Sequence, residues 1–333
     1  MSKVSVLIAV YNAERYLKEC LDSVCSQTLR DIQIICIDDC STDSSAQILD
    51  SYAARDARVK VLHLPVNRGQ AFARNEGLKI ADGDYVMMLD SDDWLGKDAI
   101  EIAYDTIIAD EENDCCLFDL IQYYQDENRT EPYRNRTDKR VFKGEEAFRL
   151  SLSWGLHGLY MVRASIHKAH PYDVSCRLYS DDNTTHIHYL YSRKVVLSHG
   201  KYYYRKHSAS MTNGISLRRF DHLDANLSMK RTLLAEAEKG HISEPEKVLD
   251  MYETYRWLNI VDAYWVYHSN RSCFTAPERN EIETRIAEKL KSVERSRIPF
   301  SLKLKLGYYP FRSFRLFSLV ERFYFGLRKL IGR

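Results

Sequence analysis

Short runs of mainly apolar residues alternate with amphipathic segments over the first 95 residues. The first run, VSVLIAV (4–10), is short, β-branched and uncharged, as a strand buried on both sides of a sheet is. One helix is expected after Asn12, a second from about residue 41 to about 56, and a third over 69–81. This alternation predicts an α/β fold with a mostly parallel, Rossmann-like sheet flanked by helices. The expected strands cover 4–10, 32–38, 59–64 and 84–90.

The remaining chain changes pattern twice. Between about 97 and 215 the signals are mixed, with strands expected at 115–124 and 194–204 and an exposed polar loop between 125 and 140. From 217 to 295 the spacing of apolar residues is helical. We therefore expect a first domain over 1–215, a helical region over 216–296, and a basic amphipathic tail over 297–333.

Composition narrows the functional classes only slightly. The 333 residues are 45% hydrophobic, which suits a globular protein, and 48 Lys and Arg nearly balance 47 Asp and Glu. The first apolar run lacks a charged leader, and no run approaches the ~18–20 residues that span a bilayer. These features predict a cytoplasmic protein, and the balanced charge indicates no particular partner.

The stretch GDYVMMLDSDDW, residues 83–94, places three acids directly after an apolar run. Asp90, Asp92 and Asp93 would repel one another unless a cation, a helix terminus or water relieves them. Ligands of parallel sheets bind outside the carboxyl ends of the strands, and hard cations such as Mg²⁺ or Mn²⁺ prefer oxygen ligands. A cation shared with a diphosphate would explain the cluster. Alternatively, Asp92 or Asp93 caps a helix that follows directly.

Four motifs in order carry a resemblance to a known family. They are VSVLIAVYNAERYLKECLDSVCSQT, IICIDDCSTDSS, NRGQAFARNEGLKIADGDYVMMLDSDD and YYYRKHSAS. Together they closely resemble glycosyltransferase family 2, enzymes of the GT-A fold that use nucleotide-diphosphate sugars. The resemblance covers about residues 2–212 and is strongest over 2–95.

The resemblance implies a role for each matching residue near the donor. The implied roles are nucleotide binding by the main chain near Ala9 and Tyr11, with the Tyr11 ring beside the base; reading of the base edge by Asp39; contacts of Arg68 and Arg74 with the nucleotide or its phosphates; ribose binding by Asp90; and metal binding by Asp92. The alternatives are that Tyr11 packs on the sheet edge, that Asp38 caps the next helix, and that Arg74 is a surface charge.

The family also implies a catalytic base downstream of the metal site. Members usually carry a Glu-Asp pair there, whereas this chain has Ser180-Asp181-Asp182. Transfer to a hydroxyl needs a proton acceptor, and we favour Asp182 over Asp181. A polar turn with a helix cap is the alternative. Arg205 and His207 are candidates for contacts with the diphosphate or the acceptor, or for a structural role.

The tail 297–333 contains nine Lys and Arg against Glu321 alone, a formal charge of nine minus one, or +8. Apolar residues recur in it at helical spacing, with arginines elsewhere on the wheel. This pattern predicts a helix on an anionic membrane surface, at the inner face of the cell membrane. Docking on the protein's own core or on a partner subunit is the alternative. No nucleic-acid partner is expected, since no recognition motif accompanies the charge. The apolar face contains Leu316, Val320, Phe323, Leu327 and Leu330.

The leading hypothesis is an inverting, metal-dependent, non-processive glycosyltransferase using Mn²⁺ or Mg²⁺. It would move a sugar from a nucleotide-diphosphate donor, with UDP favoured, to a glycan or lipid-linked glycan in cell-surface polysaccharide synthesis. ETYRW (253–257) is a near match to a signature of processive relatives, but we expect a helical core segment there. The alternatives are a catalytically idle nucleotide-binding scaffold at the membrane and a nucleotidyltransferase. A nucleotidyltransferase should carry a Gly-rich, Lys-bearing phosphate loop near the N-terminus, and this sequence has none there.

Overall fold

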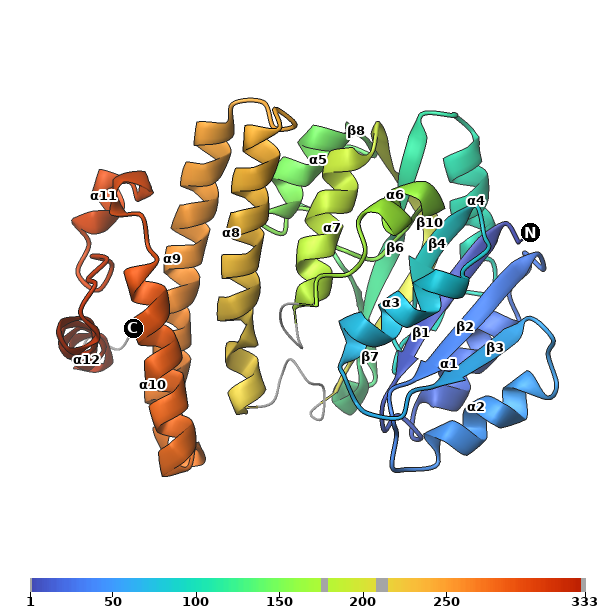
Figure 1. Cartoon of the computed structure of the whole chain (residues 1–333), viewed down its shortest axis with the longest axis horizontal. Helices are drawn as coiled ribbons and strands as arrows, with labels where there is room; N and C mark the ends of the chain where they lie inside the picture. Colours follow the sequence, from blue (N-terminus) through green and yellow to red (C-terminus); the bar gives the residue numbers. More distant parts are fainter. Residues whose placement is uncertain (1, 175–178, 208–214, 331–333) are drawn as a thin grey trace. The chain divides into compact units, whose positions relative to one another are not determined.

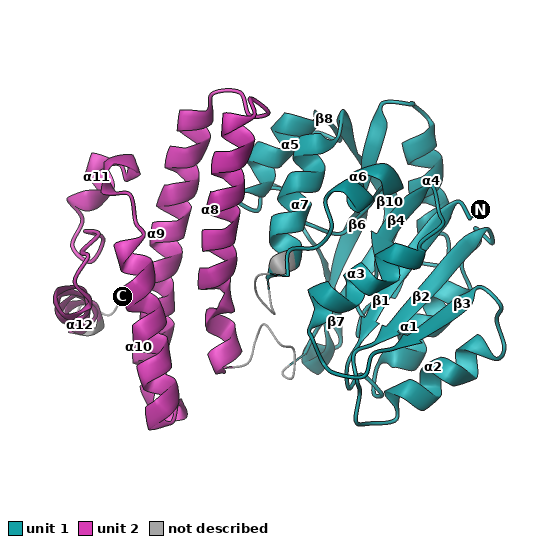
Figure 2. Ribbon diagram, in the orientation of Figure 1, with its two compact units in different colours: residues 1–213 teal, residues 214–333 magenta. Residues whose placement is uncertain are grey.

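The computed structural model describes residues 2–174, 179–207 and 215–330. The chain divides into two compact units, Met1–Asn213 and Gly214–Arg333, which Figure 2 shows in different colours. Each unit has its own hydrophobic core. The first unit carries the sheet that sequence patterning predicts, and the second is helical.

One sheet organises the first unit. Its strand order is β3-β2-β1-β4-β9-β6-β10-β5, with β7 paired to β6 and β8 paired to β10. The β1 strand pairs in parallel with β2 and β4, and β6 pairs in parallel with β10. Their carboxyl ends therefore lie along one edge. The strands are β1 (Val4–Val10), β2 (Ile32–Asp38), β3 (Val59–His63), β4 (Tyr85–Met88), β5 (Trp94–Leu95), β6 (Asn113–Tyr124), β7 (Arg129–Pro132), β8 (Val141–Lys143), β9 (Tyr160–Arg163) and β10 (Lys194–Lys206).

The long predicted strands are confirmed, and the mostly parallel α/β class with them. The differences are short strands. The expected loop at 125–140 contains a 3₁₀ turn, η1 (Gln125–Glu127), and strand β7. Strand β9 lies between β4 and β6 and is antiparallel to both. Four residues are too few for their periodicity to distinguish a strand from a buried helical turn.

Helices pack on the sheet through their apolar stripes. Helix α3 (Gln70–Ile80) contacts β1 and β2 (Figure 1). Gly77 lies at that contact: a Cβ there would meet Ile37 Cδ1 at 2.7 Å. The glycine weakens the helix locally, but it allows α3 to approach β2 closely. The other helices of this unit are α1 (Leu17–Cys25), α2 (Ser45–Ala53), α4 (Ala99–Ile108), α5 (Gly144–Ser151), α6 (Ala164–Ala169) and α7 (Ser180–Tyr191).

The second unit is built around one long helix, α9 (Pro245–Ser269). Its apolar side chains and those of the surrounding helices form a separate core, in which Trp257 and Phe317 are fully buried. The ETYRW segment lies inside α9, as expected for a helical core segment, and Trp257 Nε1 donates to the Tyr308 carbonyl at 2.8 Å. The surrounding helices are α8 (His222–Glu238), α10 (Ala276–Lys291), α11 (Phe300–Lys303) and α12 (Phe314–Leu330).

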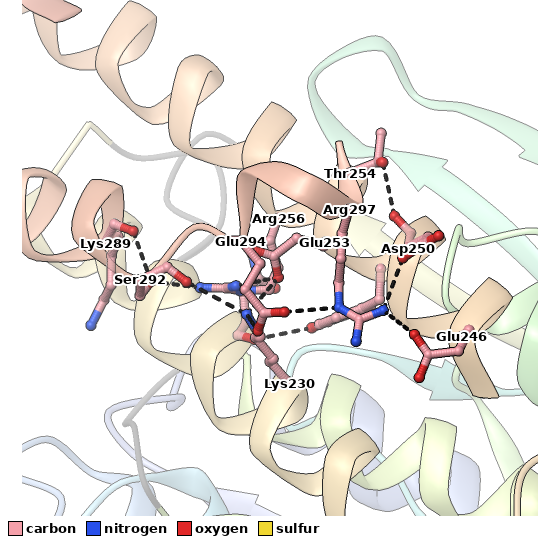
Figure 3. A network of polar contacts seen from close by, with 12 residues as sticks. Lys230, Glu246, Asp250, Glu253, Thr254, Arg256, Lys289, Ser292, Glu294 and Arg297 are labelled. Atoms are coloured by element: carbon pink, nitrogen blue, oxygen red, sulfur yellow. Dashed lines mark hydrogen bonds and ion pairs between the residues drawn. The ribbon is translucent and has the colours of Figure 1, made fainter. Parts of the chain in front are cut away.

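A buried ionic network joins α8, α9 and the segment after α10 (Figure 3). Glu253, 1% exposed, accepts from Arg256 at 2.6 Å and lies 3.0 Å from Lys230 Nζ. Its other oxygen accepts the Glu294 N–H at 2.8 Å. One carboxylate thus compensates two cations and one amide in a region that excludes water, so removing it leaves buried charge without a partner.

We expect Glu253→Ala to lower the free energy of unfolding by about 3–5 kcal/mol. Arg256 loses its buried counter-charge, and Lys230 keeps the more exposed Glu294 as its acidic partner. Glu246→Gln is the matched control. Glu246 pairs with Arg297 in the same region but is 76% exposed, so its loss should change stability by less than about 1 kcal/mol. Urea denaturation followed by circular dichroism measures both. Equal effects of the two substitutions would contradict the assignment of Glu253 as the centre of the network.

Candidate active site

The carboxyl ends of β1, β2 and β4 place three predicted site segments at one edge of the sheet. The register aligns Val10 with Asp38, and β4 lies on the other side of β1. Beyond the strand ends, the Asp39 N–H donates to the Val10 carbonyl at 2.8 Å and the Leu89 N–H to the Leu7 carbonyl at 3.0 Å. The chain segments leading to Tyr11, Asp39 and Asp90 are therefore held together by backbone hydrogen bonds.

The candidate nucleotide residues differ in how accessible they are. Tyr11 is 44% exposed beyond β1, and Ala9 pairs with Ile37 inside the sheet. Asp39 is 3% exposed, and its two carboxylate oxygens accept the N–H groups of Arg68 at 2.9 Å and Gly69 at 2.7 Å. Asp39 thus fixes the loop that precedes α3.

The side chain of Arg68 lies exposed on that loop. Its guanidinium carbon lies 3.6 Å from the centre of the Phe72 ring. Gly69, at φ 92°, allows the sharp entry into α3. A cationic side chain at the rim of the site is well placed to meet an anionic ligand.

Arg74 takes partners different from those that a surface charge would have. It is 1% exposed on α3, and its guanidinium bonds Asp90 Oδ1 at 2.5 Å and Asp181 Oδ2 at 3.3 Å. The ring of Tyr172 lies 5.3 Å below it. Arg74 therefore connects α3, the acidic turn and α7 across 107 residues of sequence, and the surface-charge alternative is wrong.

Asp90 lies in a crowded electrostatic environment. Besides Arg74, it accepts from Gln70 Nε2 at 2.9 Å, and its own N–H donates to the Tyr202 hydroxyl at 3.1 Å. Burial raises the pKa of Asp90 to about 6, and the Asp92 and Asp181 carboxylates add to the rise while Arg74 opposes it. The Asp90 carboxyl group is held in place, and its raised pKa means that its charged form is disfavoured.

Asp92 and Asp93 point to different environments. The Asp92 side chain is 34% exposed, and its Oδ2 lies 3.2 Å from His207 Nε2. Asp93 is 1% exposed and accepts the Arg205 N–H at 2.7 Å. The next helix, α4, begins only at Ala99 with Asp98 at its cap position. The alternative in which Asp92 or Asp93 caps a following helix is therefore wrong.

The donor set at Asp92 fits a hard divalent cation that shares its shell with substrate. Asp92 Oδ2 and His207 Nε2 converge, and the partial exposure of Asp92 leaves room for water and phosphate. Within the described ranges, no group of three or more His, Cys, Asp and Glu side chains is arranged to hold a metal. Mg²⁺ commonly uses one or two protein carboxylates and completes its shell with water and substrate phosphates.

The two candidate bases begin helix α7 and have different surroundings. Asp181 is ion-paired with Arg74, whereas Asp182 is half-buried. Burial raises the pKa of Asp182, and the Asp181 carboxylate raises it further. Later on α7, His186 bonds Ser151 Oγ at 2.8 Å and His188 bonds the Tyr160 hydroxyl at 2.7 Å. Both histidines are buried in the core of the unit.

Arg205 and His207, the sequence candidates for contacts with the diphosphate or the acceptor, are bonded to the acidic turn. Their spacing was the available signal: residues two apart at a strand end share a face. The chain offers no local indication that this face meets Asp92, because the contact spans 115 residues. Glu19, which pairs with Arg205, gave no sequence signal either.

A solved structure has the same architecture. The crystal structure of S. aureus TarS 1-349 in complex with UDP-GlcNAc superposes with a TM-score of 0.72 at 20% identity, covering 97% of this chain and 91% of that one. This similarity shows that the chain has a GT-A type of fold, an α/β sheet flanked by helices.

The family is shown by sequence. The family model described as glycosyl transferase family 2 matches residues 5–171, half of the chain, and the chain belongs to that family. Glycosyltransferase GlyG of Streptococcus pneumoniae is 29% identical over 220 residues, 62% of this chain and 72% of that protein. The poly(ribitol-phosphate) beta-glucosyltransferase of Bacillus spizizenii is 46% identical over 101 residues, 29% of this chain and 16% of that protein. The protein is therefore a glycosyltransferase.

We expect Arg74→Met to destabilise the protein by about 3–5 kcal/mol at pH 7, because Asp90 and Asp181 lose their buried cation. The loss should be smaller at pH 4. The folded-state pKa of Asp90 lies above its ordinary value, so the native state binds more protons than the unfolded state and stability falls as pH rises. Without Arg74 that pKa rises further. Ionised Asp90 at pH 7 therefore costs the variant more stability than it costs the wild type.

Chemical denaturation at the two pH values measures this difference. Arg55→Met is the control, since Arg55 is an exposed arginine at the end of α2 that bonds Ser51. A loss of stability that is equal at both pH values would show that Arg74 acts through packing and not through the charge of Asp90.

Proposed function

We propose that this glycosyltransferase moves a sugar from a UDP-sugar to a hydroxyl of a glycan or lipid-linked glycan in cell-surface polysaccharide synthesis. The observation that carries the proposal is that Arg74 joins the acidic turn to the candidate base helix α7. Tyr11 and Asp39 follow the paired strands β1 and β2 at the same edge of the sheet. The UDP-GlcNAc bound to TarS and the beta-glucosyltransferase name of the Bacillus spizizenii relative support the choice of donor and pathway.

The proposed donor site uses the exposed edge of the sheet. The Tyr11 ring lies beside the base, the main chain near Ala9 lines the nucleotide site, Asp39 reads the base edge and Asp90 contacts the ribose. Both oxygens of Asp39 already accept one amide each, and each keeps a lone pair for a base N–H. Arg68, exposed at the rim, meets the phosphates. Arg74 is enclosed by carboxylates and orients them, a role that replaces the direct phosphate contact expected from sequence.

The proposed metal site consists of Asp92 and His207, which would hold Mn²⁺ or Mg²⁺. Such an ion, when bound, neutralises the negative charge that develops on the leaving diphosphate. Asp92 would offer the ion a carboxylate oxygen and His207 a ring nitrogen, and the buried Asp93 anchors the turn that carries Asp92.

The proposed base is Asp182. Its carboxylate accepts the proton of the acceptor hydroxyl as that oxygen attacks the anomeric carbon and the bond to the diphosphate oxygen breaks. Attack opposite the leaving group inverts the anomeric centre in one step. Asp181 is held by Arg74. Burial raises the pKa of Asp182, so its ionised carboxylate binds a proton more tightly than an ordinary Asp does.

We also propose a functional division of the chain. Residues 1–215 form the catalytic domain, 216–296 a helical region, and 297–333 a membrane-binding segment on the inner face of the cell membrane. No helix of the described residues has both the length and the apolarity to cross a bilayer, so the proposed association is peripheral. The Glu253 network shows that ETYRW serves the core of the helical unit, which supports a non-processive enzyme.

Helix α12 supports the membrane proposal because it has two apolar faces. Phe317 and Phe325 pack on the core of the helical unit, so docking on the protein's own core accounts for one face. Leu316 and Phe323 belong to the other face and are 46% and 62% exposed. Burial raises the pKa of Glu321, the one acid here, to about 8, so it carries little negative charge at pH 7. Leu319 and Leu330 of α12 are exposed as well. The other exposed apolar and basic residues of the tail include Phe300, Leu304, Arg312, Arg315 and Arg322.

We expect Asp182→Asn to lower kcat by about 10²–10⁴-fold, because the acceptor hydroxyl loses its base. Calorimetric UDP binding should persist, since Asp182 takes no part in the proposed nucleotide site. UDP release with Mn²⁺, a panel of UDP-sugars and cell-envelope acceptors measures turnover, and NMR of the product reports the anomeric configuration. The wild-type rate should fall below the raised pKa of Asp182, where the base is protonated.

Two results would contradict this function. An Asp182→Asn variant as active as wild type would remove the base assignment. A wild-type protein that binds UDP but transfers no sugar to any acceptor would instead favour the catalytically idle scaffold. Asp181→Asn separates the two acids, because it should weaken the Arg74 contact without removing the base.

We expect the protein to co-sediment with vesicles containing about 30% phosphatidylglycerol and to be released by salt. Replacing Arg312, Arg315 and Arg322 by Gln should weaken binding about 10²-fold, since each basic residue contributes about 1 kcal/mol. Leu319→Ser should weaken it as well, whereas Leu258→Ser, at an exposed position of α9, serves as control. Binding to neutral vesicles that is equally strong would refute the electrostatic part of the proposal.

A further inference from the structure

The end of β10 reaches the acidic turn through two side chains. Arg205 and His207 are two residues apart, so both project from the same side of the chain. His207 Nε2 meets the side chain of Asp92 at 3.2 Å, and Arg205 Nε donates to the main-chain carbonyl of Asp92 at 2.8 Å. The same residue is therefore contacted at its carboxylate by one side chain and at its backbone by the other.

Arg205 also holds the neighbouring residue of the turn. Its own main-chain N–H donates to Asp93 Oδ1 at 2.7 Å. Asp93 is buried, and burial raises the pKa of Asp93, with Asp90 and Asp92 adding to the rise. Through one carbonyl and one carboxylate, Arg205 joins two consecutive residues of the turn to strand β10.

The guanidinium is itself fixed from several sides. It forms an ion pair with Glu19 of α1 and donates to Gln125 Oε1 at 3.3 Å. The rings of Trp94, Tyr16 and Tyr123 lie 4.5, 5.0 and 5.5 Å from its carbon. A cation between aromatic faces is stabilised by their quadrupoles. Arg205 therefore has little freedom to change its position.

These contacts disfavour the diphosphate contact for which the sequence made Arg205 a candidate. The residue is 6% exposed, and each of its nitrogens Nε, Nη1 and Nη2 already donates to a protein oxygen. A phosphate would have to displace Glu19 or Gln125 and enter a site walled by aromatic rings. The geometry favours a role through the turn over a role on the ligand.

We propose that Arg205 is a positioning residue for the metal-binding turn, one that holds the Asp92 carboxylate in register with His207. The inference rests on the proposed metal site at Asp92. Groups that orient metal ligands typically change metal affinity 10- to 100-fold when they are removed. Arg205 does so by bonding the main chain of the ligand and not its carboxylate, which remains available to the ion.

The test is a titration of the metal-free, nucleotide-free protein with Mn²⁺, followed by electron paramagnetic resonance. We expect Arg205→Met to weaken Mn²⁺ binding about 10- to 100-fold. Arg205→Lys should recover part of the loss, because an ammonium can reach one carbonyl but cannot bond Asp92, Gln125 and Glu19 together. UDP binding measured without metal should stay unchanged in both variants.

Arg140→Met is the matched control. Arg140 also donates to main-chain carbonyls of β10, those of Leu197 and Ser198, but at a distance from the turn along the strand. We expect it to bind Mn²⁺ as wild type does. If Arg205→Met does not fold, Glu19→Gln removes the ion pair from an accessible side chain and should weaken Mn²⁺ binding by a smaller factor, as Arg205→Lys does.

Asp92→Asn separates failure of this inference from failure of the proposed function. If Asp92→Asn binds Mn²⁺ as wild type does, the metal site itself is wrongly assigned. If Asp92→Asn loses Mn²⁺ while Arg205→Lys and Glu19→Gln retain wild-type affinity, the metal site stands and the positioning role of Arg205 is refuted.

Discussion

The acidic turn after β4 depends on two buried arginines that approach it from opposite sides. Arg74 reaches Asp90 from α3 and continues to Asp181 on α7. Arg205 reaches the backbone of Asp92 and the carboxylate of Asp93 from the end of β10. Carboxylates this close would otherwise be driven apart or protonated. The Arg74 guanidinium offsets the charge of Asp90 and Asp181, and Arg205 fixes the backbone of the turn through its side chain and its own main-chain N–H. The proposed steps use that arrangement.

The sheet makes this convergence possible. Parallel strands β1, β2 and β4 deliver their following residues to one edge, and β10 brings a residue from more than 110 positions away to the same place. The antiparallel strand β9 sits between β4 and β6, so it spaces the acidic turn from the end of β6. The site is an outcome of strand order as much as of the motifs themselves.

The sequence predicted the parts of the fold that carry a local signal. Strands such as Val4–Val10 and Ile32–Asp38 are buried on both faces, and that burial demands an uninterrupted apolar run. Strand β9 was not predicted, because four residues are too few to show a strand periodicity. The Asp92 helix cap was wrong because α4 begins at Ala99, after the short strand β5 has used the intervening residues.

In the candidate site too, the sequence predicted the residues that have a local signal but not their distant partners. Motif spacing predicted that Asp39, Asp90 and Asp92 would share one edge, because each follows a strand. It could not predict the partners of Arg74 and Arg205, which are set by contacts across 107 and 113 residues. A helical position such as that of Arg74 is compatible with an exposed charge or a buried one, and only the tertiary fold distinguishes them.

The balance of charge in the cluster also bears on the proposed cation. Arg74 is shared between two carboxylates and the guanidinium of Arg205 is paired with Glu19. Among the described residues, His207 is the basic side chain that contacts the Asp92 carboxylate. A diphosphate entering beside Asp92 would therefore meet a carboxylate that the arginines do not neutralise, and Coulomb repulsion at about 4 Å is several kcal/mol at a protein surface. Positive charge supplied between Asp92 and the diphosphate turns that repulsion into attraction, which is why the arrangement of the two arginines favours a metal-dependent reaction.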